Sequence, residues 1–544
     1  MSEDNKINKQ YNPSDYDRYN MLRNELKREN RIEDLENIIS LMSPVKKIGN
    51  ICKDELGGNI KVAIVGAGLS GLAAAFELKK IGCNVSIFEQ SKRIGGRTYT
   101  YYFDRVNNNY GDFGESSIPI SHYTTWHYID LFNLETELIN TDINYYYLRN
   151  SGYCNIEDQS FEKVYSKYDL TEEDKIKLNN KEYIGILNKY IKSLTPDERI
   201  ELISIKENYC EKIIDLDKLT LKKAYEKEGF SEEAINLIGY IMGNKEYFNY
   251  SLLEILQKEY TLDFKNNYVV KGGMIQLPFA IYEALINNES KVYDDINKEQ
   301  LGNVDIKFGF TIEEIEYKEK INLKYRDLEN DGLETEEFDY LIYTDPIKNL
   351  KRIEFKENLS GIKLRAMDDI NLVNSQKIYL YLKNKFWEEK DSENGFKYGI
   401  LITDLPLYSI YYPSEKSNEP VVLLASYGLS DKSIDFTNLD EEIKIKDTMK
   451  YIEKIHNLPS GYLDSILLDY NSFSWGDIKY IWGFSTMFKP EEKTLYSYGI
   501  IKPEINNKLF FAGESTSAKH GSQQGELQSG MIAASKIIEE ILNK

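Results

Sequence analysis

The chain of 544 residues is long enough for two or three domains with sizeable cores. Its 89 acidic and 68 basic residues give a formal net charge of −21, which argues against nucleic acid and anionic membrane surfaces as partners. Such a net charge is most simply explained by solubility. A negative field would also favour a cationic substrate such as an amine.

The four cysteines (Cys52, Cys83, Cys154 and Cys210) show neither metal-ligand nor disulfide spacing, which is typical of a reducing compartment. The first ten residues are polar and lack the apolar core of a signal peptide, and no apolar run reaches transmembrane length. We therefore expect a cytoplasmic protein with no metal site and no membrane partner. Assembly into a homo-oligomer is left open.

Residues 1–54 are highly charged, and apolar residues recur at helical spacing between Tyr16 and Met42. This pattern predicts one or two amphipathic helices that end at Ser43-Pro44. We expect them to form an extension on the outside of a later domain.

Residues 60–100 hold the most informative motif. A β-branched apolar run, typical of a buried parallel strand, leads into Gly66-Ala67-Gly68-Leu69-Ser70-Gly71 and then into an Ala/Leu-rich helix. A second strand ends on Glu89, which lies 18 residues after Gly71. In this dinucleotide-binding pattern Gly66 permits a tight turn, Gly68 lets backbone approach a pyrophosphate, and Gly71 lets helix and strand pack closely. The helix N-terminus at Ser70 faces the phosphates, and Glu89 would bind the ribose hydroxyls.

Arg93-Ile94-Gly95-Gly96-Arg97 follows directly. With this second glycine pair and its arginines, the whole stretch resembles the flavin-binding start of the flavin amine oxidase family, which includes monoamine, polyamine and L-amino acid oxidases. The resemblance implies FAD as cofactor, with Arg93, Gly96 and Arg97 beside the pyrophosphate and flavin, and Arg97 as the phosphate neighbour. Later segments are most similar to L-amino acid oxidases and tryptophan 2-monooxygenase.

The segment Gly114-Glu115-Ser116-Ser117-Ile118-Pro119 resembles the family's G-A-M-R-I-P, which lies against the flavin. Ser116 and Ser117 are therefore expected near the cofactor and the substrate. Ser117 stands where L-amino acid oxidases carry the arginine that binds the substrate carboxylate, and serine cannot make that bidentate contact. Either the substrate lacks a carboxylate, or another group binds it; Arg105 is near in sequence.

After a mostly helical stretch, the middle of the chain returns to the nucleotide-binding domain with further strands. Residues 123–266 read as helical, and strands follow at 304–308, 311–317 and 338–343. The resemblance implies that Ile312 contacts the adenine side of FAD through its main chain. A core role fits its side chain equally well.

The alternating strand 375–382 precedes a Phe386-Trp387 pair and resembles the family strand whose lysine holds a water at the flavin. We assign that catalytic role to Lys377. Tyr411 and Tyr412 resemble the amino-acid oxidase segment in which one tyrosine points at the substrate carboxylate. Because strand residues alternate, only one of the two faces the cavity.

Aromatic residues from 475 to 486 resemble the family's wall beside the flavin, where they surround the reacting amine. Trp475 and Trp482 are the aromatic candidates, and the Gly483 carbonyl is a candidate acceptor for the amine. Core packing explains any one of these aromatics equally well.

The last segment, residues 509–544, resembles the family's C-terminal flavin motif F-A-G-E, H-G, S-G-x-x-A-A. A helix starting near Gly525 would direct its positive end at the flavin, where charge develops on reduction. Ser522 stands where amino-acid oxidases often carry tryptophan. This region contains no cysteine, so the resemblance implies non-covalent FAD. Its expected cofactor residues are Gly513, Glu514, Gln524, Gly525 and Leu527.

The predicted fold is α/β, with a Rossmann-like FAD domain of the glutathione-reductase type, a mixed-sheet substrate domain and a helical insert. The expected boundaries are: residues 1–54, an N-terminal helical extension on the substrate domain; 55–101, 267–355 and 495–544, the FAD domain; 102–155 and 356–494, the substrate domain; and 156–266, the helical insert.

The predicted function is oxidation of the C–N bond of an L-amino acid by FAD and O2, giving a 2-oxo acid, ammonia and H2O2. Three alternatives stay open: a primary amine or polyamine oxidase without a carboxylate site, an amino-acid 2-monooxygenase that gives an amide, and a flavoprotein without catalysis.

Overall fold

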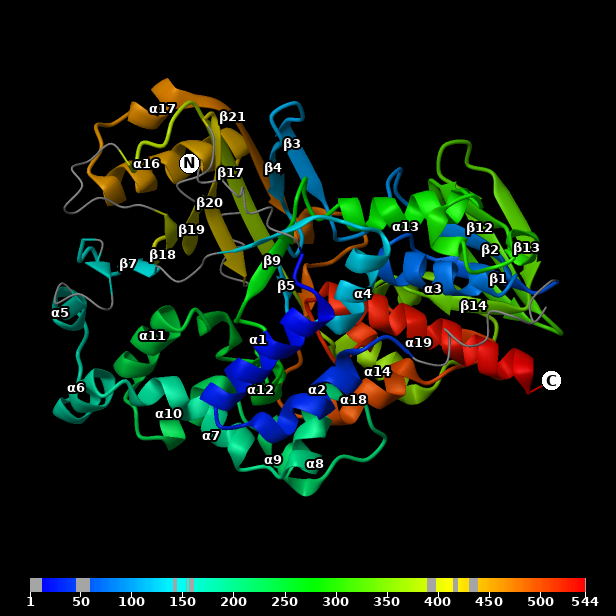
Figure 1. Cartoon of the computed structure of the whole chain (residues 1–544), viewed down its shortest axis with the longest axis horizontal. Coiled ribbons are helices and arrows are strands. Elements are labelled where there is room, and N and C mark those ends of the chain that lie inside the picture. The colour runs from blue at the N-terminus through cyan, green and yellow to red at the C-terminus, as the bar shows by residue number, and fades with distance from the viewer. Residues whose placement is uncertain are drawn as a thin grey trace, which may run out of the picture.

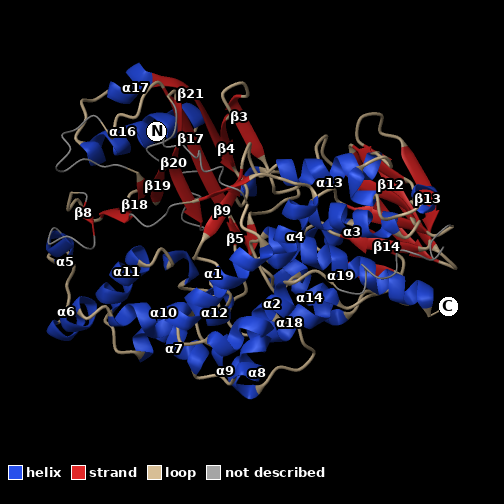
Figure 2. Cartoon of the chain, in the orientation of Figure 1, coloured by secondary structure: helices blue, strands red, loops and turns tan. Residues whose placement is uncertain are grey.

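The computed structural model describes residues 12–45, 59–139, 144–152, 154–155, 161–388, 398–413, 419–429 and 439–543. The boundary expected at residues 54 and 55 lies outside the described residues, as does Cys52. Figures 1 and 2 show the described elements, with strands gathered in two separate groups and most helices in the lower half of the view.

A five-stranded parallel sheet organises the nucleotide-binding half. Its strand order is β10-β2-β1-β14-β23, and these neighbours come from distant parts of the chain. The strands are β1 (Lys61–Val65), β2 (Asn84–Glu89), β10 (Val304–Phe308), β14 (Tyr340–Tyr343) and β23 (Leu509–Phe511). The strands predicted at 84–88 and 304–308 are confirmed.

Both faces of this sheet are covered, as its continuous apolar strands require. Val62 and Ile64 face a core with α3 (Leu69–Lys80), α13 (Gln276–Ile286) and α19 (Gln523–Leu542). Ala63 and Val65 face a core shared with a four-stranded sheet of order β13-β12-β11-β15. Its strands are β11 (Phe310–Tyr317), β12 (Ile321–Asp327), β13 (Leu333–Phe338) and β15 (Glu354–Phe355). The three layers are helices, parallel sheet and a smaller sheet, and they lie at the right of Figure 1.

A seven-stranded mixed sheet forms the second half, at the upper left of Figure 1. Its order is β21 (Leu467–Ser474), β17 (Ser375–Leu382), β20 (Val421–Leu429), β19 (Ser409–Tyr412), β18 (Gly399–Thr403), β7 (Asn144–Tyr147) and β8 (Cys154–Asn155). Helices α16 (Glu441–His456) and α17 (Tyr462–Ile466) share a core with one face of the sheet. The opposite face is therefore available for the functional site.

A two-stranded hairpin, a three-stranded sheet and helix α4 (Tyr123–Leu131) lie between the two halves. The hairpin pairs β3 (Thr100–Asp104) with β4 (Asn109–Asp112), and the small sheet has the order β5-β9-β6. Its strands are β5 (Ile118–Pro119), β6 (Thr136–Leu138) and β9 (Asn267–Val270).

Residues 123–266 are predicted to be mostly helical. The first part holds α4 and also the strands β6 and β7, which pair with distant strands, and β8, which pairs with β7. The part between residues 161 and 260 is helical. Its helices are α5 (Glu162–Tyr165), α6 (Glu172–Asn179), α7 (Ile186–Lys192), α8 (Pro196–Ile200), α9 (Glu211–Asp217), α10 (Leu221–Lys227), α11 (Glu232–Ile241) and α12 (Leu252–Tyr260). Beyond it, α14 (Gly361–Asp369) and α18 (Glu492–Ile501) pack on the core behind the smaller sheet.

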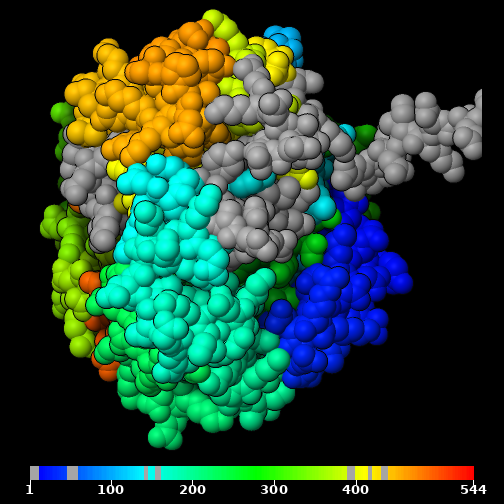
Figure 3. All heavy atoms as spheres, turned by 90° about the vertical axis from the view of Figure 1, so that its left-hand side faces the viewer, coloured from blue at the N-terminus to red at the C-terminus, as the bar shows by residue number. Residues whose placement is uncertain are grey.

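The N-terminal extension forms α1 (Asp15–Arg28) and α2 (Leu35–Met42), which confirms the two predicted helices. Figure 3 shows them (blue) against the helical segment (cyan to green). The buried Arg31 guanidinium donates to the Glu259 carbonyl oxygen at 3.0 Å, and Arg199 bonds Asp34 at 3.1 Å. Arg18 bonds Asp130 of α4 at 2.7 Å. The extension therefore packs on the helical segment as well as on α4.

No helix in the described part of the chain combines the length and the apolar character needed to cross a membrane. The described residues also contain no group of three or more His, Cys, Asp or Glu side chains arranged to hold a metal ion.

Candidate active site

The turn between β1 and α3 is shaped by glycines. Gly66 adopts a φ of +103°, which favours glycine, and a Cβ on Gly71 would lie 2.1 Å from the Gly66 carbonyl oxygen. No side chain caps α3 at Gly68, so its first N–H groups point outward without a side-chain acceptor. Ser70 sits in this first turn and is buried against Gly530 of α19. The turn offers the backbone donors and the open approach that a pyrophosphate needs.

Glu89 ends β2 at the carboxyl edge of the sheet. Its carboxylate accepts hydrogen bonds from the amides of Ala67 and Ser91, each at 2.8 Å. Ile312 of β11 lines a small cavity beside this edge together with Phe88 and Asp345. Burial and the neighbouring Glu89 raise the pKa of Asp345 to about 7. This edge therefore carries the acidic and apolar groups expected around an adenosine.

Two arginines after β2 have different surroundings. The Arg97 guanidinium donates to Glu514 at 3.1 Å, to Glu526 at 3.3 Å and to the Phe484 carbonyl oxygen at 2.9 Å. Arg93 instead lies over the ring of Tyr99, with 5.1 Å between the guanidinium carbon and the ring centroid. Gly96 next to Arg97 adopts a φ of +55° and lies beside Gly68, where a Cβ would come within 3.1 Å of the Gly68 Cα. Arg97 thus lies between the first glycine motif and the C-terminal motif.

The C-terminal motif is held by Glu514. Its buried carboxylate accepts from the amides of Thr486 (2.9 Å) and Gly521 (2.8 Å), and the adjacent Gly513 amide donates to the Ser529 hydroxyl at 2.9 Å. Gly525 leaves no room for a side chain, because a Cβ would lie 2.2 Å from the Lys519 carbonyl oxygen.

Ser522, where the resembled family often has tryptophan, is the N-cap of α19. Its hydroxyl accepts from the Gly525 amide at 3.2 Å. Gln524 does not point at the glycine turn: its side chain accepts from the amides of Thr124 and Thr125 and donates to the Met42 carbonyl oxygen. Leu527 is fully buried in the core. Gln524 and Leu527 therefore have packing roles through their side chains.

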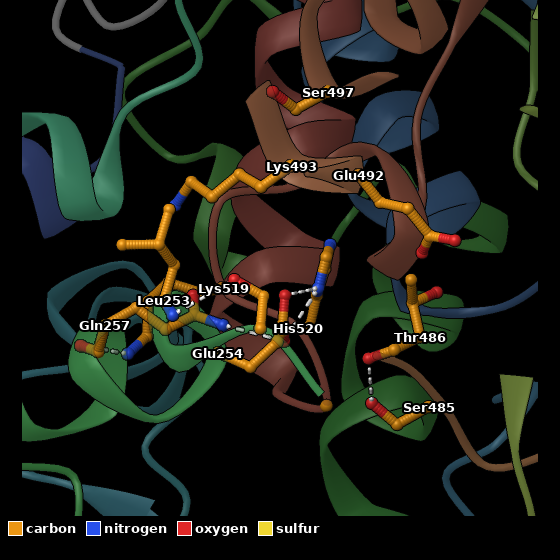
Figure 4. A network of polar contacts seen from close by, with 12 residues as sticks. Leu253, Glu254, Gln257, Ser485, Thr486, Glu492, Lys493, Ser497, Lys519 and His520 are labelled. Carbon is orange, nitrogen blue, oxygen red and sulfur yellow. Dashed lines mark hydrogen bonds and ion pairs between the residues drawn. The ribbon is translucent and has the colours of Figure 1, made fainter. Parts of the chain in front are cut away.

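A buried polar network fixes the loop before α19 (Figure 4). The His520 ring lies 3.1 Å from a Glu254 oxygen on α12. The Lys519 amine donates to Asp263 at 2.7 Å and to the Gln257 carbonyl oxygen at 3.3 Å. The helical segment thereby supports the loop that carries Gly521 and Ser522.

These observations fit FAD. Glu89 suits the adenosine, and the glycine turn with the uncapped start of α3 suits the pyrophosphate. Arg97, which bonds Glu514, and the start of α19 form the flavin end of this series. Arg97, Glu115, Gly521 and Gln523 line one small cavity at the flavin end of this series.

Lys377 connects this cofactor region to the mixed sheet. Its amine donates to the Asp112 carbonyl oxygen at 2.8 Å and to the Gly114 carbonyl oxygen at 2.6 Å. On the neighbouring strand its direct partner is Tyr427, whose ring centroid lies 5.0 Å from the amine. Burial lowers the pKa of Lys377 to about 8, against the opposing influence of Asp112 and Glu115. A lysine whose pKa lies this close to the physiological range suits proton handling.

A cavity of about 820 Å³ opens between the mixed sheet and the helical segment. Tyr411 and Tyr427 form part of its wall, with 6.1 Å between their ring centroids. Tyr412 points to the opposite face of the sheet, into the core under α16, where its hydroxyl lies 2.6 Å from the His456 ring nitrogen. Tyr411 is thus the member of the pair that faces the cavity.

The remaining predicted pocket residues do not line this cavity. Trp475 is fully buried and donates to the Phe113 carbonyl oxygen at 2.9 Å. Trp482, next to Gly483, is 51% exposed and donates to Asn349 at 2.6 Å. Ser117 and its neighbour Ser116 are half-buried just before β5. The structure therefore places Tyr411 in the cavity wall and Lys377 beside the wall residue Tyr427, and it places the tryptophans elsewhere.

Arg105, which is near Ser117 in sequence, lies on the exposed turn of the β3–β4 hairpin, stacked on Tyr102 at 4.6 Å. It has no place in the cavity.

Four residues that matter here were not singled out by sequence reasoning: Tyr427, Glu115, Glu246 and Lys258. Strand alternation alone would put Tyr427 on the core face with Leu423 and Ala425, and only a bulge in the pairing of β17 with β20 turns it to the cavity. Glu115 lies inside the flavin-proximal segment already recognised. Glu246 and Lys258 carry no sequence signal, because helical charges usually face solvent.

Glu115 accepts from the Gln523 amide at 2.7 Å, and burial raises the pKa of its carboxyl to about 8. Lys258 of α12 donates to the His520 carbonyl oxygen at 3.4 Å, and the nearby Tyr247, Asp263 and Glu115 raise its pKa despite burial. Lys258 is therefore a cation beside the flavin end of the site.

Known proteins resemble the chain along most of its length. It is 28% identical over 479 residues to an L-amino-acid oxidase of Sistrurus catenatus edwardsii, with 87% of this chain and 86% of the relative covered. An L-amino-acid oxidase of Crotalus adamanteus is 27% identical over the same length and shares.

The fold matches solved amine oxidases. Putrescine oxidase bound to putrescine superposes with a TM-score of 0.67 at 19% identity, covering 88% of this chain and 99% of that one. Cyclohexylamine oxidase from Brevibacterium oxydans gives 0.66 at 17% identity, covering 89% and 100%. Residues 69–538 match the sequence profile described as flavin containing amine oxidoreductase. The chain is a member of this flavin-containing amine oxidoreductase family, with FAD as its cofactor.

Proposed function

We propose that the chain oxidises the C–N bond of an L-amino acid, using FAD and O2, to a 2-oxo acid, ammonia and H2O2. The observation that carries this proposal is the arrangement on the mixed sheet. Tyr411 and Tyr427 line the cavity, and Tyr427 lies opposite Lys377, whose amine bonds Gly114 next to the flavin-end residue Glu115. The relatives that match over most of the chain are L-amino-acid oxidases.

FAD, held by the glycine turn, Arg97 and the start of α19, would supply the acceptor for the hydride lost from the carbon beside the neutral amine and the route for both electrons to O2. The chain orients the substrate and limits access of water. Two N–H groups of a neutral Lys377 amine donate to Asp112 and Gly114, so its lone pair is left to accept a hydrogen bond from a water molecule. That water is placed to hydrolyse the imine to the oxo acid and ammonia.

The substrate carboxylate needs partners in place of the family arginine, because Ser117 has no charge. Tyr411 offers a hydroxyl from the cavity wall. Lys258 offers the positive charge. Burial raises the pKa of Glu115, two residues before Ser117, and that of Tyr247, which ends the turn whose Glu246 lines the cavity, and the Lys258 charge acts to lower both. We propose Tyr411 and Lys258 as the pair that binds the carboxylate.

The test is anaerobic titration of the holoenzyme with L-norleucine and with n-pentylamine, which differs from it by lacking the carboxylate. Bleaching of the flavin absorbance by L-norleucine supports the proposal. Bleaching by the amine alone contradicts it and indicates an amine oxidase, the alternative that Ser117 and the amine oxidase fold favour. A flavin that no substrate bleaches indicates a protein without catalysis.

The reaction products distinguish the oxidase from the remaining alternative, a monooxygenase. An oxidase gives the 2-oxo acid and one H2O2 for each amino acid consumed, whereas a monooxygenase gives the amide and CO2. Loss of L-norleucine turnover with retained pentylamine turnover in Lys258→Met supports the carboxylate assignment. Lys265→Met is the matched control, because Lys265 is an exposed lysine on the rim of the cavity that Tyr411 lines.

A further inference from the structure

The cavity contains a carboxylate that the proposed reaction does not use. Glu246 lies in the short helical turn Lys245–Tyr247, between α11 and α12, and lines the cavity together with Tyr411 and Tyr427. Among the described residues, no lysine, arginine or histidine nitrogen lies within 4.0 Å of its carboxylate. The Lys245 charge acts on this carboxyl from beyond 4.0 Å, and burial remains the main influence on the pKa of Glu246. Such a half-buried carboxylate is costly unless a ligand brings a closer counter-charge.

The other charges of the cavity are arranged differently. Glu25 forms an ion pair with Arg28 at 2.5 Å, and the Arg28 side chain is 73% exposed. Lys265 is also exposed. The Lys245 amine lies 3.9 Å from the centroid of the Tyr240 ring. The basic groups of the cavity therefore lie at its exposed rim or against an aromatic ring. Glu246 is the acidic residue of the interior wall.

Aromatic rings surround this carboxylate. Tyr240, Tyr408, Tyr411 and Tyr427 all line the cavity and are half-buried. The charge of Glu246 acts on the hydroxyls of Tyr240, Tyr411 and Tyr427, whose pKa values are raised, with burial as the main cause. Ring faces attract ammonium and guanidinium groups, and a nearby carboxylate adds a charge-assisted hydrogen bond.

We propose that Glu246 and the tyrosines around it form a subsite for a second cationic group of the substrate. The substrate class is then a basic L-amino acid or, if the carboxylate site is absent, a diamine. This inference rests on the proposed function and specifies its substrate. The formal net charge of −21 supports it, because a negative field raises the local concentration of cations.

The experiment compares two pairs with matched carbon chains on the holoenzyme: L-lysine with L-norleucine, and 1,5-diaminopentane with n-pentylamine. Within each pair only the distal ammonium differs. We expect kcat/KM for the charged member to exceed that for the neutral member by about 10- to 100-fold, the range of one charge-assisted hydrogen bond. The pair that is oxidised identifies the amino-acid or the diamine source.

Glu246→Gln keeps the shape and removes the charge. The charged-to-neutral ratio should fall at least about tenfold in this variant, and Glu246→Lys should reverse the preference toward L-glutamate. Glu25→Gln is the matched control, because Glu25 lines the same cavity but has Arg28 as its partner; it should retain the wild-type ratio. Flavin absorbance and melting temperature verify that each variant is folded and loaded.

A ratio near one in the wild type, or a ratio that Glu246→Gln leaves intact, overturns the subsite while the proposed function stands. Anaerobic calorimetry of 1,5-diaminopentane and n-pentylamine binding tests the case in which the subsite exists but the protein oxidises neither compound. A binding preference for the diamine that disappears in Glu246→Gln, without any turnover, supports the subsite and refutes the oxidase function. Equal binding without turnover refutes both.

Discussion

The amine nitrogen of Lys377 lies 2.6 Å from the carbonyl oxygen of Gly114, so a strand of the mixed sheet is bonded directly to the segment that precedes Ser116 and Ser117. This contact joins the two halves of the molecule at the flavin end of the site. It also fixes the orientation of the amine, because a second bond runs to Asp112.

Replacing Lys377 tests this arrangement. Lys377→Met should keep FAD and lower the turnover of the best substrate by about 10²-fold or more, as expected for a lost proton-transfer group. Burial lowers the pKa of Lys377 to about 8, so wild-type activity should rise as the pH rises through 8 and the amine becomes neutral. Rapid-reaction kinetics across pH would show this rise in the wild type and its absence in Lys377→Met. An unchanged profile would remove Lys377 from the reaction.

The two neighbouring tyrosines provide a matched pair. Tyr411→Phe removes a hydroxyl from the cavity and should raise KM for the amino acid about tenfold. Tyr412→Phe removes the bond to His456 in the core and should lower the free energy of unfolding by about 1–3 kcal/mol with KM unchanged. The opposite distribution of effects would show that the wrong tyrosine has been assigned to the substrate.

Substitutions in the glycine turn distinguish a glycine that folding requires from a glycine that FAD binding requires. A Cβ on Gly71 would lie 2.1 Å from backbone, so Gly71→Ala should destabilise the apoprotein. A Cβ on Gly68 would meet nothing closer than 3.8 Å, so Gly68→Ala should fold normally yet weaken FAD binding by at least about tenfold, because the added methyl group blocks the pyrophosphate. Melting of the apoproteins and FAD titration measure the two effects. Normal FAD affinity in Gly68→Ala would place the pyrophosphate elsewhere.

The N-cap of α19 predicts a stability effect at Ser522. Ser522→Ala removes the acceptor for the Gly525 amide and should cost about 1 kcal/mol of the free energy of unfolding, whereas Ser522→Asp should retain it. Denaturation of the apoproteins is the measurement, since Ser522 also borders the flavin-end cavity. Equal stability of all three would mean that the bond contributes nothing.

The charge of Glu246 predicts a pH dependence of specificity. Burial raises the pKa of this carboxyl to about 7, so it is neutral below pH 7 and anionic above it. The groups that face it are the Lys245 amine and the hydroxyls of Tyr240, Tyr247, Tyr411 and Tyr427. The preference for L-lysine over L-norleucine should therefore grow between pH 6 and 8, while the lysine ammonium stays charged throughout. Glu246→Gln should show a flat ratio, and a flat ratio in the wild type would contradict the assignment.

Local patterns predicted much of the fold. The glycine turn, its flanking strands and helix, and the strand 375–382 appear where periodicity and turn residues place them, because each depends on interactions within a short stretch of chain. The N-cap role of Ser522 is not predicted from the sequence, where the serine stands out only because it takes the place of the tryptophan of amino-acid oxidases. The positions of Gln524 and Trp482 were also beyond sequence reasoning, since Gln524 bonds Met42 and Trp482 bonds Asn349, both far away in the chain.

By itself the sequence determined the dinucleotide-binding turn, the FAD-type motifs at both ends of the chain and the loss of positive charge at Ser117. These are properties of residue type and spacing, which short-range geometry converts into structure. Only the tertiary structure decided which tyrosine faces the cavity, how Lys377 bonds Asp112 and Gly114, and that Glu246 and Lys258 lie at the site. Charges on helices and helical turns carry no local signal for burial, and only the packing of the turn Lys245–Tyr247 and of α12 against distant parts of the chain removes Glu246 and Lys258 from water.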